Sequence, residues 1–327
     1  MPQKYTIDLH IHTLLSDGDK TPCRVVDCAA EAGLKKICLT DHDCVHMNYD
    51  KLREYAHSKG VEVLPFSGVE VNTMYFEEEK PLLWVDILVY GADEALRDPR
   101  FTSMFSRFYE HTNVLARRQF ECLPEAGIKM SYDELFLLDG DVAPVYKNDM
   151  YCRSYVLKRA AKKLGIPHEE LRSKYPDIFP YNLPTRSVNL KRIADMPDSA
   201  ELIRMANELG LVTVMAHPSC MATYWECDEH LENVTQMKKI IRDLAAEGLD
   251  GLEACHKELE HDGTVELVKS LADELGLITT GGSDYHDDTE RGNDLGVYGT
   301  SEEQLAVLME RIREKSEKTR KNYDSFP

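Results

Sequence analysis

Long apolar runs, basic residues and cysteine pairs are all scarce in this chain of 327 residues. No apolar stretch reaches the length that spans a bilayer, so we expect no association with a membrane. The chain runs from Met1 straight into an apolar segment at Ile7, which leaves no room for a signal peptide. The nine cysteines are odd in number and form no Cys-x-x-Cys pair. We therefore predict a reduced, cytoplasmic protein in which cysteines such as Cys38 are small core residues.

Positive charge is also in short supply, because 39 Lys and Arg residues stand against 58 Asp and Glu residues, for a formal net charge of −19. Binding to long nucleic acids depends on a basic surface, so this class of partner is excluded. The charge is uneven, however, since residues 97–192 hold 17 basic and 12 acidic residues and the remainder holds 22 and 46. We expect an acidic body with a metal site and a basic segment that binds an anion. For most residues of that segment, a solvated helical surface is the alternative.

Strand-like and helix-like segments alternate at both ends of the chain. Up to about residue 91, helices over about 22–33 and 49–59 separate short apolar strands, and the first helix has Thr21 as its N-cap. From about residue 199, three predicted helices each end at a glycine, and an apolar strand follows each of them. These glycines are Gly210, Gly248 and Gly276. Strands separated by helices are typical of βαβ units and of a parallel sheet.

Residues 92–197 interrupt this alternation. They contain helices near 104–123 and 150–164 and no strongly apolar strand. We interpret them as an inserted, mostly helical cap subdomain on the ligand side of the strands. The two segments 1–91 and 198–327 then form one domain around the same core.

Histidine and acidic residues follow the short apolar runs in a regular way. In the run Ile7–His12, alternation along a strand puts His10 and His12 on one face. Similar groups occur just past later apolar runs, namely Thr40-Asp41-His42-Asp43, Gly68-Val69-Glu70, His217-Pro218 and Gly282-Ser283-Asp284-Tyr285-His286. In barrels of alternating strands and helices, functional residues gather where strands end. Imidazole and carboxylate are ligands of divalent metals, so the pattern predicts one shared metal site.

Together with Asp17-Gly18, these motifs resemble the PHP family of metal-dependent phosphoesterases, named for polymerase and histidinol phosphatase, over roughly residues 4–91 and 200–298. The resemblance implies an amidohydrolase-like, distorted (β/α)7 barrel, with the cap subdomain inserted into it. It also implies two or three divalent metal ions, each Mn, Zn or Fe. The implied ligands are His10, His12, Glu70 and Asp284 for the first metal, Glu70 and His217 for the second, and Asp17, His42 and His286 for the third.

One position departs from the family pattern. Asp86 stands where family members usually carry a histidine ligand of the second metal. A carboxylate still binds divalent cations, so Asp86 is the expected ligand there, in a site that prefers Mn²⁺, binds more loosely or stays empty. The alternative is a slipped alignment that leaves Asp86 on a surface turn.

The cap and the barrel also supply candidate substrate-binding and catalytic residues. Arg153-Ser154-Tyr155 resembles a family motif of Arg, Thr or Ser, then His, and Tyr155 replaces that histidine. Arg118 resembles a second arginine of the same insertion, and both arginines are expected to bind a substrate phosphate. Asp284 is the expected catalytic residue beside the metals. For the general acid, His256 and His261 are candidates, although each is also compatible with a solvated loop.

The resemblance implies hydrolysis of a small phosphate ester by attack of metal-bound hydroxide. We expect an anionic metabolite, either a sugar or nucleotide phosphate with a second phosphate or a cyclic phosphodiester. The alternatives are an exonuclease on short oligonucleotides, a histidinol phosphatase and a non-catalytic PHP module. The sequence does not indicate the oligomeric state.

Overall fold

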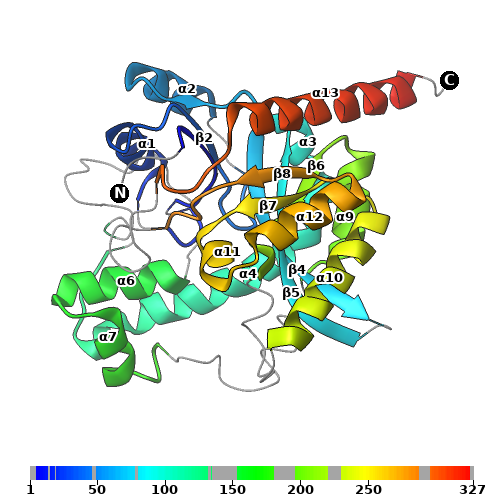
Figure 1. Cartoon of the computed structure of the whole chain (residues 1–327). Helices are drawn as coiled ribbons and strands as arrows, with labels where there is room; N and C mark the ends of the chain where they lie inside the picture. The colour runs from blue at the N-terminus through cyan, green and yellow to red at the C-terminus, as the bar shows by residue number, and fades with distance from the viewer. Residues whose placement is uncertain are drawn as a thin grey trace.

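The computed structural model describes residues 5–13, 15–18, 20–45, 49–77, 80–131, 134, 153–179, 196–219, 230–286 and 295–324. They form a mixed α/β fold with two sheets, one of three strands and one of five. Helices surround the sheets, and the long α13 (Glu302–Asp324) runs along the top of the molecule in Figure 1. None of the described helices combines the length and apolar character needed to cross a membrane.

The three-stranded sheet follows the predicted alternation. Its strands β1 (Ile7–Ile11), β2 (Lys36–Leu39) and β3 (Glu62–Val63) are parallel. The connecting helices are α1 (Pro22–Glu31) and α2 (Tyr49–Ser58). The Thr21 hydroxyl accepts a hydrogen bond of 3.2 Å from the Arg24 amide, which confirms the predicted N-cap. Cys38 is buried in the core, as expected for a small apolar residue.

The five-stranded sheet has the order β4-β5-β6-β7-β8 and begins with an antiparallel hairpin. The strands β4 (Ser67–Glu77) and β5 (Lys80–Gly91) pair along their whole length, from Ser67 opposite Gly91 to Glu77 opposite Lys80. The prediction that strands and helices alternate up to residue 91 is therefore wrong between β3 and β5. Antiparallel neighbours need only a short turn, whereas parallel neighbours need a crossover such as a helix.

The C-terminal part restores the alternation. The strands β6 (Val212–Met215), β7 (Gly251–Cys255) and β8 (Ile278–Gly281) are parallel to one another, while β6 is antiparallel to β5. The helices are α9 (Ser199–Glu208), α10 (His230–Ala246), α11 (Lys257–Asp262) and α12 (Val265–Leu275). Gly276 ends α12 with a φ of 67°, and Gly210 and Gly248 are also left-handed, as the sequence predicts for helix ends.

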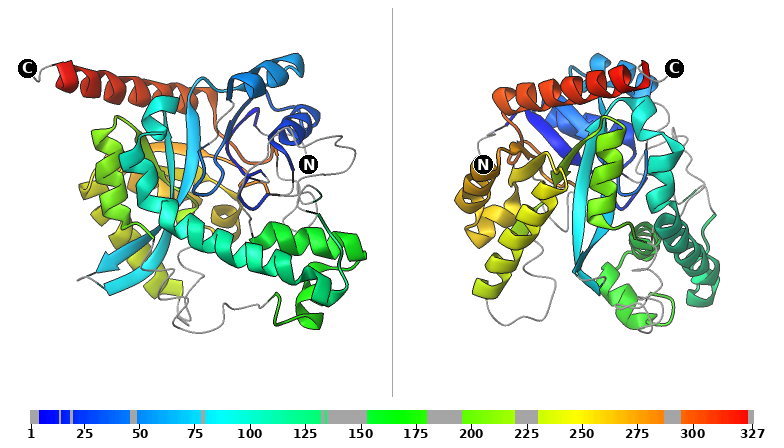
Figure 2. Two further views of the ribbon diagram at one scale, coloured as in Figure 1. Left: turned by 180° about the vertical axis from the view of Figure 1, so that it is seen from behind. Right: turned by 90° about the vertical axis from the view of Figure 1, so that its right-hand side faces the viewer.

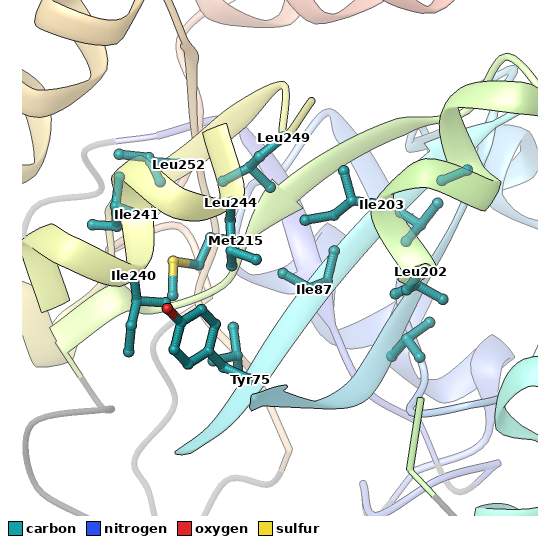
Figure 3. Close-up of a cluster of buried hydrophobic side chains, with 14 of the residues drawn as sticks. Tyr75, Ile87, Leu202, Ile203, Met215, Ile240, Ile241, Leu244, Leu249 and Leu252 are labelled. Atoms are coloured by element: carbon teal, nitrogen blue, oxygen red, sulfur yellow. The ribbon is translucent and has the colours of Figure 1, made fainter. Parts of the chain in front are cut away.

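A hydrophobic cluster packs these helices onto the sheet. Helix α9 lies against β4, β5 and β6, and α10 lies against α9 and α12. Figure 3 shows Ile87 and Met215 of the sheet facing Ile203, Ile241 and Leu244 of the helices. Burying each such side chain contributes on the order of 2 kcal/mol to the stability of the fold. The cluster therefore holds in place the strands that carry the site residues.

A separate group of helices forms what we call the helical lobe. It comprises α4 (Pro99–Cys122), η1 (Leu123–Ala126), α6 (Arg153–Leu164) and α7 (His168–Lys174), and it follows the short α3 (Asp93–Leu96). Figures 1 and 2 show α6 and α7 at the opposite end of the molecule from α13. The helices expected near 104–123 and 150–164 are both present, and the described part of residues 92–197 contains no strand.

The two sheets do not close into one continuous barrel within the described residues. Their edges are linked by isolated bridges, from Ile11 to Tyr285 and from His42 to Glu70. Backbone hydrogen bonds strengthen these links, since the His12 amide donates to the Tyr285 carbonyl at 2.9 Å and the Glu70 amide to the Thr40 carbonyl at 3.1 Å. The bridges bring the segments that carry the predicted site residues into contact.

Candidate metal centre

The predicted metal ligands lie on β1, β4 and β5 or directly after β1, β2, β6 and β8. Glu70 is an exception to the expectation that these groups follow a strand, because it lies inside β4. Asp86 lies inside β5. The apolar run that precedes Glu70 is therefore not a strand that ends just before this residue. Gly68 instead lets the start of β4 pass close to β2, where a Cβ would come within 2.7 Å of Thr40 Cγ2.

The backbone is strained at three of these strand ends. Asp43, His217 and Asp284 have φ values of 51°, 26° and 51°, in the left-handed region that residues other than glycine rarely adopt. Such strain persists where surrounding contacts hold it and is common at functional sites. At Asp284 the amide donates to the His10 carbonyl at 2.9 Å. Gly282 permits this approach, because a Cβ there would overlap the Cβ of His10.

Four side chains form the first group, namely His10, His12, Glu70 and Asp284. Their ligand atoms all lie within 4.8 Å of one another, and all four residues are buried. Glu70 Oε2 lies 3.0 Å from both His10 Nε2 and His12 Nε2. Asp284 Oδ1 lies 3.6 Å from His10 Nε2 and 3.2 Å from His12 Nε2. Two imidazole nitrogens and two carboxylates therefore converge on one point.

The second group consists of Glu70, Asp86 and His217. Glu70 Oε1 lies 3.0 Å from His217 Nε2, so the two oxygens of this carboxylate face two different groups. Asp86 Oδ2 lies 4.0 Å from His217 Nε2, and the Trp84 indole donates to Asp86 Oδ1 at 2.7 Å. Asp86 is thus on a strand beside Glu70 and not on a surface turn. Burial and the nearby charge of Glu70 raise the pKa of Asp86 to about 7.

The third group contains the expected Asp17, His42 and His286, and the structure adds His12 to it. His286 Nε2 lies 3.0 Å from Asp17 Oδ2, and His12 Nδ1 lies 3.5 Å from Asp17 Oδ1. The rings of His12 and His286 stack with centroids 4.2 Å apart. His12 therefore offers one nitrogen to the first group and the other to the third.

Opposite charges hold the first group together. Burial would raise the pKa of Glu70, but His10 and His42 outweigh it and keep that pKa well below its usual value. Burial would likewise lower the pKa of His12, but hydrogen bonds to Asp284 and Glu70 raise it to about 10. The carboxylates thus draw positive charge to this point in the form of protons. A divalent cation bound by the same nitrogens and oxygens would supply that charge instead.

Buried carboxylates to which the sequence analysis assigned no role support these groups. Glu253 of β7 lies with Oε1 3.1 Å from His10 Nδ1. Asp41 accepts hydrogen bonds from the Thr13 amide at 2.7 Å and from the Ser16 hydroxyl at 2.7 Å, which fixes the loop before Asp17. The sequence did contain a signal for these roles. Each residue is an acid inside or beside an apolar strand, and a buried carboxylate there needs a hydrogen-bonding partner.

The candidate general acid lies beside the first group. His256 directly follows β7, is fully buried, and has its Nε2 3.7 Å from Asp284 Oδ2. The side chain of the other candidate, His261, lies outside the described ones.

The candidate substrate-binding arginines are both in the helical lobe. Arg118 is exposed on α4 and has no hydrogen bond or ion pair with the described residues. Arg153 begins α6, which packs against α4. The side chains of Arg153 and Tyr155 lie outside the described ones, so their position relative to the three groups stays a prediction.

Comparison with known proteins identifies the fold and a domain within the chain. The chain superposes on a protein from Bifidobacterium adolescentis assigned as a metal-dependent phosphoesterase, with a TM-score of 0.63 and 22% identity, covering 93% of this chain and 96% of the other. The two therefore share a fold. The family model described as PHP domain matches residues 8–167. The chain therefore carries a PHP domain over these residues, as its motifs predict.

Three relatives match most of the chain. It is 27% identical over 282 residues to a phosphoribosyl 1,2-cyclic phosphate 1,2-diphosphodiesterase of Eggerthella lenta, covering 85% of this chain and 93% of the relative. It is 26% identical to a 3',5'-nucleoside bisphosphate phosphatase of Chromobacterium violaceum, covering 89% and 90%. It is also 26% identical to a 5'-3' exoribonuclease of Haemophilus influenzae, covering 88% and 91%.

Proposed function

We propose that this protein is a metal-dependent phosphoesterase that hydrolyses a small phosphorylated metabolite carrying a second phosphate, including cyclic phosphodiesters. The observation that carries the proposal is the convergence of the three groups, in which Glu70 joins the first to the second and His12 joins the first to the third. The relatives support the substrate class. One is named for a phosphoribosyl cyclic phosphate and another for a nucleoside bisphosphate, and each of these compounds carries two phosphates.

The donor set fits divalent cations. Under this proposal the first group holds one ion, the second group another, and the third group a third, each Mn, Zn or Fe. Bound ions lower the pKa of water to near neutrality and stabilise charge on the phosphoryl oxygens. The carboxylates keep the imidazole nitrogens aligned, because each His ligand faces at least one acidic oxygen within 4.0 Å.

The remaining roles fall to residues around these groups. Asp284 belongs to the first group and also lies beside His256, whose Nε2 is the candidate proton donor for the leaving oxygen. Arg118 and Arg153 are the candidate ligands of the remote phosphate, because a planar guanidinium suits two phosphate oxygens. Binding energy from that phosphate would orient the reacting ester.

The proposal extends to the architecture. We propose that residues 1–91 and 198–327 form a distorted (β/α)7 barrel and that residues 92–197 form its cap. The bridges between the edges of the two sheets support a barrel. The separate hydrophobic cluster of the helical lobe, which includes Leu123, Val156 and Leu171, supports a cap with its own core.

A substrate screen tests the function. The purified protein, reconstituted separately with Mn²⁺, Zn²⁺ and Fe²⁺, is given a nucleoside 3',5'-bisphosphate, a ribose 5-phosphate 1,2-cyclic phosphate and p-nitrophenyl phosphate. The products, including ring-opened monoesters and free phosphate, are separated and quantified. We expect the two compounds with a second phosphate to react with a higher kcat/KM than the generic ester. No hydrolysis of any phosphate ester by protein that holds metal would overturn the proposal.

The arginine variants test the second phosphate. Arg118→Ala and Arg153→Ala should each reduce kcat/KM for the bisphosphate by about 10-fold or more and leave p-nitrophenyl phosphate unchanged, since hydrogen bonds to charged groups contribute about 2 kcal/mol. Lys129→Ala removes an exposed cation in the segment after η1 and serves as the control. Equal losses on both substrates would mean that the arginines support the fold.

Hydrolysis of short oligonucleotides is the second candidate, supported by the exoribonuclease relative. The net charge of −19 opposes long nucleic acids but not oligonucleotides of a few residues. The same screen with a 5'-phosphorylated trinucleotide separates the two. A higher kcat/KM for the trinucleotide than for the mononucleoside bisphosphate would favour the exonuclease.

A further inference from the structure

Glu253 is a fully buried carboxylate in the middle of β7, between Leu252 and Ala254. Apolar neighbours on a buried strand make an unneeded charge expensive, so a glutamate there requires strong compensation. The compensation comes from the site. His10 Nδ1 and the backbone amide of His217 both face its carboxylate.

One carboxylate contacts two ligand-bearing segments. Both oxygens face His10 Nδ1, Oε1 at 3.1 Å and Oε2 at 3.3 Å. Oε2 also accepts the backbone amide of His217 at 2.9 Å. His217 is one of the residues with left-handed backbone, at a φ of 26°, so this hydrogen bond holds a strained residue in place. Glu253 therefore touches β1 and the segment after β6 at once.

We propose that Glu253 is the positioning residue of the metal centre: it holds the proton of His10 on Nδ1, so that the Nε2 lone pair faces Glu70 and Asp284, and it fixes the His217 backbone. The proposal rests on the proposed metal-dependent function. A carboxylate beside the distal nitrogen sets which ring nitrogen is free to bind metal. One glutamate would thereby align a ligand of the first group with a ligand of the second.

In this geometry both carboxylate oxygens of Glu253 must accept a hydrogen bond. A carboxylate accepts hydrogen bonds at either oxygen, whereas glutamine offers one acceptor oxygen and one donor NH₂. In Glu253→Gln the amide oxygen can satisfy either His10 or His217, and the NH₂ is then directed at the other donor. If the oxygen stays on the His217 amide, the NH₂ favours a proton on His10 Nε2, where the metal would bind. A role in packing alone predicts the opposite, because glutamine has almost the same shape.

Metal affinity distinguishes the two roles. Glu253→Gln and Glu253→Ala are titrated with Zn²⁺ against a chelator, and bound ions are counted by elemental analysis. We expect both variants to lose about 10- to 100-fold in affinity for at least one ion, as partners of metal-bound histidine usually do. The control is Asp250→Asn, another buried carboxylate that accepts a backbone amide, from Thr213 at 2.9 Å, and contacts none of the three groups. It should bind Zn²⁺ as the unaltered protein does.

Three results would decide the matter. Tight binding by Glu253→Gln with loss only in Glu253→Ala would reduce Glu253 to a packing residue and overturn the proposal. Binding of no divalent ion by the unaltered protein would overturn the proposed function instead. A further measurement requires neither a variant nor an activity assay. In ¹⁵N-histidine NMR of the Zn²⁺-loaded protein, His10 should be protonated at Nδ1. A His10 ring protonated at Nε2 would overturn the positioning role even if both variants failed to fold.

Discussion

His10 and His12 bring their Nε2 atoms to within 3.1 Å of each other on the same side of β1, with Ile11 between them pointing into the core. Two neutral imidazoles gain little from this approach, because a lone pair and a proton must match across each contact. The arrangement is stabilised by the two carboxylates that both rings face, those of Glu70 and Asp284. A cation held between the four groups would give each nitrogen an attractive partner.

His12 is the first residue to test, because it belongs to both the first and the third group. We expect His12→Ala to lose more than one bound ion, whereas His42→Ala should lose one. Turnover of His12→Ala should fall by more than about 100-fold, the upper end of the loss seen for residues that merely support a ligand. Elemental analysis after identical reconstitution provides the count. His57→Ala, an exposed histidine of α2, is the control. Unchanged metal content in folded His12→Ala would show that His12 is not a metal ligand.

Asp86 tests the second group. Asp86→His replaces a carboxylate by imidazole and removes one negative charge beside Glu70, so the site should shift from Mn²⁺ toward Zn²⁺. We expect a different ratio of Mn²⁺ to Zn²⁺ after reconstitution in an equimolar mixture. Trp84→Phe is a useful companion, because it removes the hydrogen bond to Asp86 Oδ1 and keeps Asp86 itself. The same metal ratio in Asp86→His and in the unaltered protein would mean that Asp86 does not contact an ion.

The sequence predicts the parts of this site that local rules control. Strand alternation suffices to put His10 and His12 on one side, and the position of His217 and Asp284 after apolar runs suffices to bring them near one strand end. It does not predict the pairing of β4 with β5, because which strands pair is decided by tertiary contacts and not by the residues of either strand. Glu253 was missed for a related reason. A single acid in the run from Leu252 to Cys255 shows its purpose only when His10, distant in the chain, is seen beside it.

Asp27 gives a prediction about stability and pH. Its carboxylate joins α1 to α2 through Tyr55 at 2.8 Å and Lys59 at 2.9 Å, and it also contacts Arg24 at 3.0 Å. Burial would raise the pKa of Asp27, but hydrogen bonds from Lys59 and Tyr55 outweigh burial and lower it. Because the folded pKa is below the unfolded value of about 3.9, the ionised carboxylate stabilises the fold above that pH. This stabilisation is lost as the pH falls through the lower, folded value.

Asp27→Asn should therefore cost about 1 kcal/mol of unfolding free energy at pH 7, a value discounted because its cationic partners Arg24 and Lys59 are 43% and 40% exposed. The cost should shrink as the pH falls from 4 toward 2. Urea unfolding at a series of pH values measures it, with Asp50→Asn on the exposed face of α2 as control. A cost that does not change with pH would mean that the charge of Asp27 is not what stabilises the contact.

Leu15 couples the helical lobe to the ligands. It lies in the loop between His12 and Asp17, yet it packs in the lobe cluster with Val156 and Leu157. We expect Leu15→Ala to weaken ion binding by the third group selectively, because the loop that carries Asp17 loses its anchor on the lobe. Leu157→Ala removes a similar volume from the lobe side of the same cluster, at a cost of about 2–5 kcal/mol, and leaves the loop's own side chains unchanged. Elemental analysis of both variants decides. An equal loss of metal would show that lobe stability matters and not the anchor at Leu15.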